Sequence, residues 1–220
     1  MSIKKHIPNS ITCCNLFSGC IACTMAFEGS FVWALAFIVL GAVFDFFDGM
    51  AARLLHVSSP MGVEMDSLAD DVTFGFAAAA MVFNFMQQLA YPTAIAPIAW
   101  LLPYAAFFIA VFSALRLAKF NIDTRQTTSF IGLPTPANAL FWASLVAGAG
   151  DWVLGLNAGW FLMLALISLT SYLLVCEIKM FSLKFKIVQR KVWMVFAAIG
   201  TAPILPLALF GLLVFIVDLF

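Results

Sequence analysis

Long apolar segments alternate with short polar connections along the whole chain. Six apolar segments come before a longer one at the C-terminal end: Ile11–Phe27, Phe31–Arg53, Gly62–Leu89, Ile98–Leu117, Pro134–Gly150, Gly159–Cys176 and Val192–Phe220. A helix needs about 20 apolar residues to cross a bilayer, and each segment is close to that length or above it. The pattern therefore predicts an all-α, polytopic membrane protein. Pro203 and Pro206 interrupt the last segment, so it forms either one kinked helix or two short ones.

The basic residues indicate how these segments are oriented. With a cytoplasmic N-terminus, the inner connections carry all 11 Lys and Arg residues and the outer connections carry none. Lys4 and Lys5, before the first apolar segment, resemble the start of a signal peptide, but no polar mature chain follows them. We therefore expect an uncleaved first span and a multi-pass protein of the cell (inner) membrane, with its N-terminus in the cytoplasm.

Composition agrees with this topology and narrows the possible functions. Hydrophobic residues make up 64% of the 220 residues and charged residues only 10%, which excludes an ordinary soluble domain. The net charge of zero excludes a polybasic nucleic-acid-binding protein. We expect a six-helix membrane domain with an N-terminal interfacial segment over residues 1–180. Residues 181–220 should form a basic cytoplasmic loop and one or two C-terminal membrane helices.

Acidic residues are concentrated at the cytoplasmic ends of the second and third segments, where six of the 11 lie between residues 45 and 71. Asp45 and Asp48 are three residues apart, and Asp66 and Asp70 are four apart, so each pair shares one face of its helix. A short turn between the segments makes the two helices antiparallel neighbours. We therefore expect these four carboxylates to converge and the other two acids of this window to point elsewhere.

Four converging carboxylates repel one another unless cations lie between them. Oxygen ligands of this kind suit the hard cations Mg²⁺, Mn²⁺ and Ca²⁺, and two divalent ions would balance the four charges. Gly49 and Gly62 would let a phosphate approach the backbone, and Arg53 offers a guanidinium to bind it. These are the components of metal-assisted phosphoryl-type transfer. On these residues alone, a structural ion-pair cluster and a cation-transport site remain alternatives.

The spacing Asp45-x2-Asp48-Gly49-x2-Ala52-Arg53-x8-Gly62-x3-Asp66-x3-Asp70 resembles the signature of the CDP-alcohol phosphatidyltransferases, with every signature position filled. The resemblance implies a six-helix membrane core, two divalent ions (Mg²⁺ or Mn²⁺), and displacement of CMP from a CDP-linked lipid by an alcohol. It implies that the four aspartates hold the metals and that Asp70 is also the general base. It further implies that six residues line the nucleotide and diphosphate: Asn9, Thr12, Gly49, Ala52, Arg53 and Gly62. Homodimers are common in this family, and we expect one here.

Three further stretches resemble the membrane-embedded phosphatidylserine synthases within that family. They are Ile7-Pro8-Asn9 with Thr12, Asn15-Leu16 and Gly19; Asp66-Ser67-Leu68-Ala69-Asp70 with Phe74-Gly75; and Leu115 to Asn121 with Gly132-Leu133-Pro134-x-Pro136-Ala137. This resemblance implies that the substrates are CDP-diacylglycerol and L-serine and that the products are phosphatidylserine and CMP. The chain departs from the pattern at Lys119, where arginine is expected, at Ala79, near an expected proline, and at the additional acid Asp71.

A serine zwitterion needs a cation for its carboxylate. Arg116, Lys119 and Asn121 lie at the cytoplasmic end of the fourth segment, on the same side as the aspartates, and we expect them to bind the acceptor. Arg116 and Lys119 have an alternative role, which is only to fix the topology and meet lipid headgroups. The acceptor could also be glycerol 3-phosphate or an inositol phosphate, and the CDP donor could be an ether lipid. A cation-coupled transporter is the most distant reading of the acidic residues.

Overall fold

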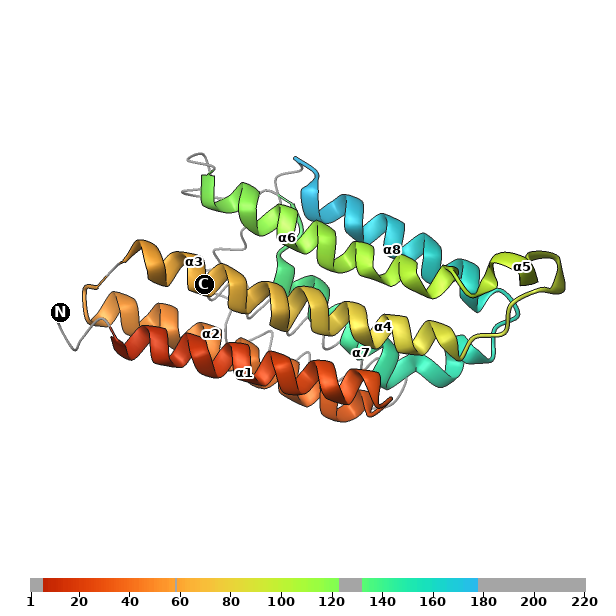
Figure 1. The fold of residues 1–220 in the computed structure, drawn as a ribbon, viewed down its shortest axis with the longest axis horizontal. Coiled ribbons are helices and arrows are strands. Elements are labelled where there is room, and N and C mark those ends of the chain that lie inside the picture. Colours follow the sequence, from red (N-terminus) through yellow and green to blue (C-terminus); the bar gives the residue numbers. More distant parts are fainter. Residues whose placement is uncertain (1–5, 58, 123–131, 178–220) are drawn as a thin grey trace, which may run out of the picture.

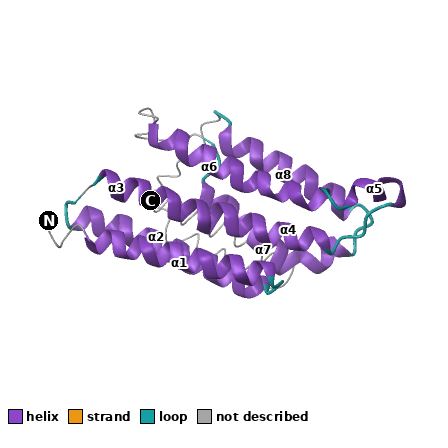
Figure 2. Cartoon of the chain, viewed as in Figure 1, coloured by secondary structure: helices purple, strands orange, loops and turns teal. Residues whose placement is uncertain are grey.

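The computed structural model describes residues 6–57, 59–122 and 132–177, and every regular element in these ranges is helical. The main helices are α1 (His6–Phe27), α2 (Phe31–Leu54), α3 (Pro60–Asp70), α4 (Ala77–Gln87), α6 (Phe107–Ile122), α7 (Thr135–Leu154) and α8 (Gly159–Val175). The shorter elements are the π-helical segment η2 (Asp71–Phe76), the 3-10 helices η3 (Thr93–Ile95) and η4 (Leu102–Ala106), and α5 (Ala96–Ala99). Figure 2 shows this all-helical architecture, which confirms the predicted fold class.

The helices α3, η2 and α4 follow one another without a break and form a rod through the centre of the bundle. Figure 1 shows this rod between the α1–α2 hairpin on one side and α6 and α8 on the other, with α7 behind it. In the most apolar part of the rod 67% of the residues are buried, compared with 22% for the corresponding part of α2. The rod therefore forms the core, and α2 leaves much of its apolar surface facing outward.

Several of these helices are long and apolar enough to cross a membrane. Among the described residues four meet this condition: His6–Phe27, Phe31–Leu54, Pro60–Gln87 and Leu102–Ile122. The helix α8 is also apolar but has 17 residues, and the 20-residue α7 buries most of one side in the bundle. Together these helices confirm the prediction of a polytopic membrane protein.

Two helices begin earlier than the hydropathy pattern suggested. The helix α1 starts at His6 instead of Ile11, so Asn9 and Thr12 lie in its first two turns. The rod starts at Pro60, because Ser59 caps it by accepting a hydrogen bond from the Gly62 N–H at 3.0 Å. Proline suits the first position of a helix, where its missing N–H would have no intrahelical partner.

The fourth span, predicted near Ile98–Leu117, is present over Leu102–Ile122, but its first part is irregular. The short helix α5 ends at Ala99, a 3-10 turn follows, and regular α-helix begins only at Phe107 and continues to Ile122. Pro97 and Pro103 lack the N–H groups that a continuous α-helix would need here. The proposed C-terminal segment Val192–Phe220, and with it the unit 181–220, lies outside the described residues.

Small residues allow α1 and α2 to approach the rod closely. A side chain at Gly19 of α1 or at Gly41 of α2 would overlap Thr73 of η2. The run Ala77–Ala80 in α4 is fully buried as well. Close backbone approach of this kind is how membrane helices gain packing contacts without a hydrophobic driving force between them.

Candidate functional site

Three carboxylates meet where α2 ends and α3 begins. Asp45 and Asp48 lie on α2 and Asp66 lies on α3, and one oxygen of each falls within 4.8 Å of the other two. The turn between the helices reverses the chain, with His56 at a positive φ of 51° and the Val57 N–H bonded to the Ala52 carbonyl at 3.0 Å. The predicted convergence of these three side chains is therefore present in the structure.

Asp70 has a separate environment, one turn further along the rod. Its Oδ1 accepts a hydrogen bond from Asn15 Nδ2 at 3.1 Å, and its carboxylate is close enough to Asp45 and Asp66 for electrostatic interaction. It is not part of the group of oxygens within 4.8 Å of one another. Asp70 is thus adjacent to the three clustered aspartates and is held to α1 by Asn15.

The two remaining acids of the window lie outside the cluster, as the helical periodicity predicts. Glu64 is exposed on α3. Asp71, the first residue of η2, places its Oδ1 near Gly75, where an added Cβ would be only 2.6 Å away. Ser113 of α6 lies on the same side of Gly75, so Asp71 faces α6 and not the three clustered aspartates.

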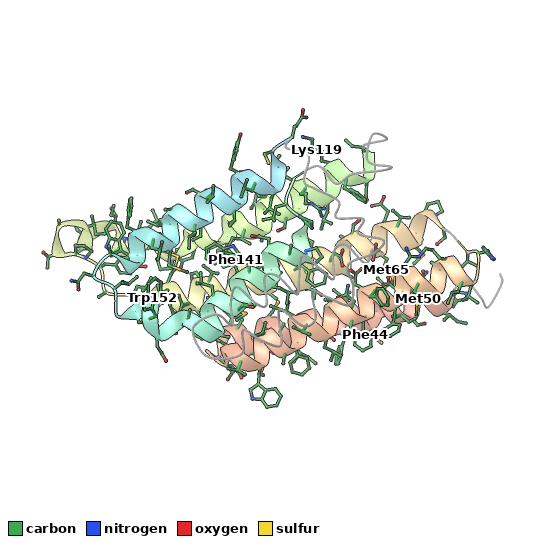
Figure 3. All side chains as sticks on the ribbon, turned by 180° about the vertical axis from the view of Figure 1, so that it is seen from behind. Phe44, Met50, Met65, Lys119, Phe141 and Trp152 are labelled. Atoms are coloured by element: carbon green, nitrogen blue, oxygen red, sulfur yellow. The ribbon has the colours of Figure 1, made fainter. Side chains whose placement is uncertain are left out.

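A cavity of about 520 Å³ opens beside the cluster, between the start of α1, the end of α2 and the start of α3. Figure 1 shows these three helix ends together at one end of the bundle. Asp48 and Asp66 line the cavity. So do all six residues expected at the nucleotide and diphosphate, which are Asn9, Thr12, Gly49, Ala52, Arg53 and Gly62. In Figure 3, Met50 and Met65 mark the neighbouring parts of α2 and α3.

The lining residues differ in what they offer a ligand. Thr12 is buried, and its hydroxyl donates to Asp48 Oδ2 at 2.6 Å, which fixes that carboxylate against α1. Gly49 has no atom within 4 Å of the place where a Cβ would be, so its backbone is open to the cavity. Arg53 is exposed at the end of α2 and can swing its guanidinium over the opening.

The clustered aspartates suit a divalent cation. Three carboxylates so close together repel one another, and a hard cation offsets this repulsion better than any described neighbour does. Asp66 Oδ1 is buried without a hydrogen-bond partner among the described residues, and such an atom normally requires one. The donor set therefore fits Mg²⁺ or Mn²⁺, with Asp45, Asp48 and Asp66 as ligands and Asp70 beside them.

The three residues expected to bind the acceptor have different positions. Arg116 is buried on α6, donates from Nη1 to Thr135 Oγ1 at 3.0 Å, and lies within electrostatic range of Asp70. Lys119 is on the surface and forms an ion pair with Glu177 at 3.3 Å. Figure 3 shows Lys119 well away from Met50 and Met65. Asn121 is exposed and donates to Ser67 Oγ at 2.9 Å, which connects α6 to α3.

Sequence reasoning gave no role to Asn15 and Thr135, which contact Asp70 and Arg116 directly. A signal for Asn15 was available, because it follows Thr12 by three residues and so lies on the same face of α1. No comparable signal existed for Thr135. Its contact with Arg116 depends on how α6 and α7 pack, and the chain between them includes residues outside the described ranges.

The sequence of this chain is similar to known proteins over most of its length. A family model described as CDP-alcohol phosphatidyltransferase matches residues 5–172. The CDP-diacylglycerol–serine O-phosphatidyltransferase of Bacillus subtilis (strain 168) is 39% identical over 132 residues, which are 60% of this chain and 70% of that protein. The residues matched by the family model include the clustered aspartates and the cavity beside them.

Two enzymes with the same name are also similar. The one from Mycobacterium leprae (strain TN) is 34% identical over 186 residues, which are 79% of this chain and 57% of that protein. The one from Saccharomyces cerevisiae (strain ATCC 204508 / S288c) is 38% identical over 152 residues, 62% of this chain and 51% of that protein. The chain thus spans little more than half the length of these two relatives. With the fold, the clustered aspartates and the match over residues 5–172 in agreement, the chain belongs to the CDP-alcohol phosphatidyltransferase family.

Proposed function

We propose that this protein transfers the phosphatidyl group of CDP-diacylglycerol to the hydroxyl group of L-serine, giving phosphatidylserine and CMP. The observation that carries the proposal is the position of Asp45, Asp48 and Asp66 beside a cavity lined by the six residues expected at the nucleotide and diphosphate. The choice of serine rests on the relatives, which are named CDP-diacylglycerol–serine O-phosphatidyltransferases.

The cavity is the proposed site of the CDP group. Gly49 and Gly62 leave the backbone accessible to the diphosphate, and Arg53 neutralises part of its charge. Asn9 and Thr12 lie on the α1 side, where the cytidine would bind. The diacylglycerol chains would extend from this end of the bundle along its apolar outer surface into the bilayer.

The metal site supports the same reaction. When bound by Asp45, Asp48, Asp66 and Asp70, two divalent ions (Mg²⁺ or Mn²⁺) would neutralise the diphosphate and the departing CMP. Thr12 contributes by holding Asp48 in one orientation through their 2.6 Å hydrogen bond. Orienting such ligands matters, because loosening a supporting hydrogen bond commonly weakens metal binding or activity by about 10- to 100-fold.

Asp70 is the proposed general base. It takes the proton from the serine hydroxyl while that oxygen forms a bond to the phosphorus nearest the diacylglycerol. The bond from this phosphorus to the bridging oxygen breaks, and CMP leaves with the electron pair. Arg116 is the proposed partner of the serine carboxylate, because it is a buried cation within electrostatic range of Asp70. Lys119 and Asn121 remain predicted acceptor residues.

The test is a reaction of purified protein in lipid nanodiscs with CDP-diacylglycerol, Mn²⁺ or Mg²⁺, and a panel of alcohols, in which CMP release is measured. We expect release that depends on L-serine, is abolished by EDTA and is restored by Mn²⁺ or Mg²⁺. Product formed only with glycerol 3-phosphate or an inositol phosphate, or CMP release without any acceptor, would overturn the assignment of serine. CMP release from an ether-linked CDP lipid, measured in parallel, tests which lipid is the donor. The molecular mass of the protein in nanodiscs tests the proposed homodimer.

A further inference from the structure

The side chain of Asn15 is buried in the interior of the bundle and touches the proposed base directly. The residue is 0% exposed, and its Nδ2 donates to Asp70 Oδ1 at 3.1 Å. The amide nitrogen must face the carboxylate, since two oxygens would repel each other there. Asn15 Oδ1 is buried and has no hydrogen-bond partner among the described residues, so the contact with Asp70 is the one that this side chain makes in that part of the chain.

The backbone of Asn15 is fixed by a second contact with the rod. Thr73, which is fully buried in η2, donates from its hydroxyl to the Asn15 main-chain carbonyl at 3.1 Å. Gly19 and Gly41 surround this contact, and a side chain at either would overlap Thr73. At Gly41 an added Cβ would also lie 3.0 Å from Asn15 Oδ1. The Asn15 side chain therefore has little space in which to rotate.

The irregular part of the rod lies at the same level. The π-helical segment η2 begins at Asp71, immediately after Asp70, and contains Thr73. A π-helical turn holds one more residue than an α-helical turn, so it shifts the faces on which the following side chains lie. Thr73 in this segment is directed toward α1, and Asp70 just before the segment is directed toward Asn15. Two hydrogen bonds therefore join α1 to the rod within four residues.

We propose that Asn15 is a positioning residue, which holds Asp70 by Oδ1 and leaves Oδ2 as the oxygen that receives the proton from the acceptor hydroxyl. The amide can donate to Oδ1 whether Asp70 is ionised or protonated on Oδ2, so the carboxyl group keeps one orientation throughout the reaction. This inference rests on the proposed function of Asp70 as the base. It adds a residue that none of the metal or nucleotide contacts includes.

The test compares Asn15→Leu with Asn84→Leu. Asn84 also donates from Nδ2, to the Phe27 carbonyl at 2.7 Å, but at the other end of α1. We expect Asn15→Leu to lower kcat by about 10- to 100-fold, because small displacements of a catalytic group cost that much, and to leave both KM values within about two-fold. Asn84→Leu should keep the wild-type kcat, although it loses a hydrogen bond of the same type.

Two further measurements show whether Asn15 acts through Asp70 or through the metal site. In an Asp70→Asn background, Asn15→Leu should change kcat by less than about two-fold, because residues that act as a unit are not additive. Mn²⁺ binding, measured by the electron paramagnetic resonance signal of free Mn²⁺, should weaken in Asn15→Leu by much less than kcat falls, because Asp45, Asp48 and Asp66 keep their positions.

A normal kcat in Asn15→Leu, additive losses in the double variant, or a parallel loss of Mn²⁺ affinity would each overturn the positioning role. Failure of the proposed function is distinguishable, because it appears in the wild-type protein as an absence of serine-dependent CMP release.

Discussion

Asp45, Asp48, Asp66 and Asp70 have different neighbours, and these decide what each substitution should do. Asp48 is 5% exposed and accepts a hydrogen bond from Thr12. Asp70 accepts one from Asn15. Asp66 has a buried oxygen without a partner among the described residues, and it faces both Asp45 and Asp48. Asp66 is therefore an aspartate whose charge the described part of the protein leaves uncompensated.

Removing the charge of Asp66 should lower the activity of the protein without lowering its melting temperature. We expect Asp66→Asn to lower CMP release by at least about 1,000-fold, because the cation loses a ligand at the diphosphate. In EDTA the same variant should melt at the same temperature as the wild type or higher, because repulsion among the clustered carboxylates is reduced. Activity and melting temperature in nanodiscs check both expectations.

Glu64→Gln is the matched control, since Glu64 is an exposed acid on the same helix and outside the cluster. It should keep wild-type activity and metal dependence. Full activity in Asp66→Asn would contradict the metal-assisted mechanism.

Arg116 and Lys119 provide a second comparison. Arg116→Ala should raise the KM for serine by about 10- to 100-fold, the loss expected for a charge-assisted hydrogen bond, and should change the KM for CDP-diacylglycerol little. Lys119→Ala should raise the KM for serine by less than Arg116→Ala does, because Lys119 lies on the surface, where charged interactions contribute less. Steady-state kinetics with each substrate varied in turn measure this difference. Unchanged serine kinetics in Arg116→Ala would remove Arg116 from the proposed acceptor site.

The sequence allowed the clustered aspartates to be predicted, but not their partners. The spacing of Asp45, Asp48 and Asp66 within their helices is a local property, and one short turn is enough to bring them together. The hydrogen bond from Asn15 to Asp70 joins residues 55 positions apart. It depends on the depth at which α1 crosses the rod, which periodicity does not determine.

At the level of elements, a substitution at Gly49 in α2 should affect helix stability and donor binding in opposite directions. An added Cβ would meet no atom within 4 Å, so Gly49→Ala should stabilise the helix by about 0.5–1 kcal/mol. The same methyl group would project from a residue that lines the cavity and should raise the KM for CDP-diacylglycerol severalfold.

Gly148→Ala is the control for this prediction, because Gly148 of α7 also has open space around its Cβ position but does not line the cavity. It should keep the wild-type KM. Thermal unfolding and donor-dependent kinetics on both variants measure the two effects. If Gly49→Ala bound the donor as the wild type does, the backbone at Gly49 would not approach the diphosphate.

Hydropathy predicted which segments form helices, but it did not predict where those helices are irregular. The apolar segments predicted the correct order of the main helices over the described residues, with ends displaced by a few positions. The break between α5 and α6 occurs where Pro97 and Pro103 interrupt an otherwise apolar stretch. The π-helical η2 has no such marker in the sequence, and it lies where Thr73 contacts Asn15 on α1.

At the level of the whole molecule, the proposed donor and acceptor sites lie on opposite sides of the rod. The cavity is formed by α1, α2 and α3, whereas Arg116 comes from α6. Asp70 lies between them, in contact with Asn15 on one side and within electrostatic range of Arg116 on the other. The residues proposed for the donor and for the acceptor therefore come from different helices, with the proposed base between them.

The proposed orientation in the membrane can be tested in whole cells. In a cysteine-free variant, Asn157→Cys lies in the exposed connection between α7 and α8, and Ile122→Cys lies at the exposed end of α6. We expect a membrane-impermeant maleimide to label Asn157→Cys from outside, and to label Ile122→Cys only after permeabilisation, because the basic residues favour a cytoplasmic N-terminus. The opposite labelling would place the cavity on the outer side.

The acids of the central rod also determine how the protein can enter a membrane. Glu64, Asp66, Asp70 and Asp71 lie within eight consecutive residues of this span. One aspartate at the centre of an inserting helix costs about 2.5–3.5 kcal/mol, and the cost is smaller toward the ends. The rod is therefore a poor substrate for release into lipid by itself. In the folded bundle α1, α6 and α7 cover this span, so we expect its stable insertion to depend on these neighbours as well as on its own apolar residues.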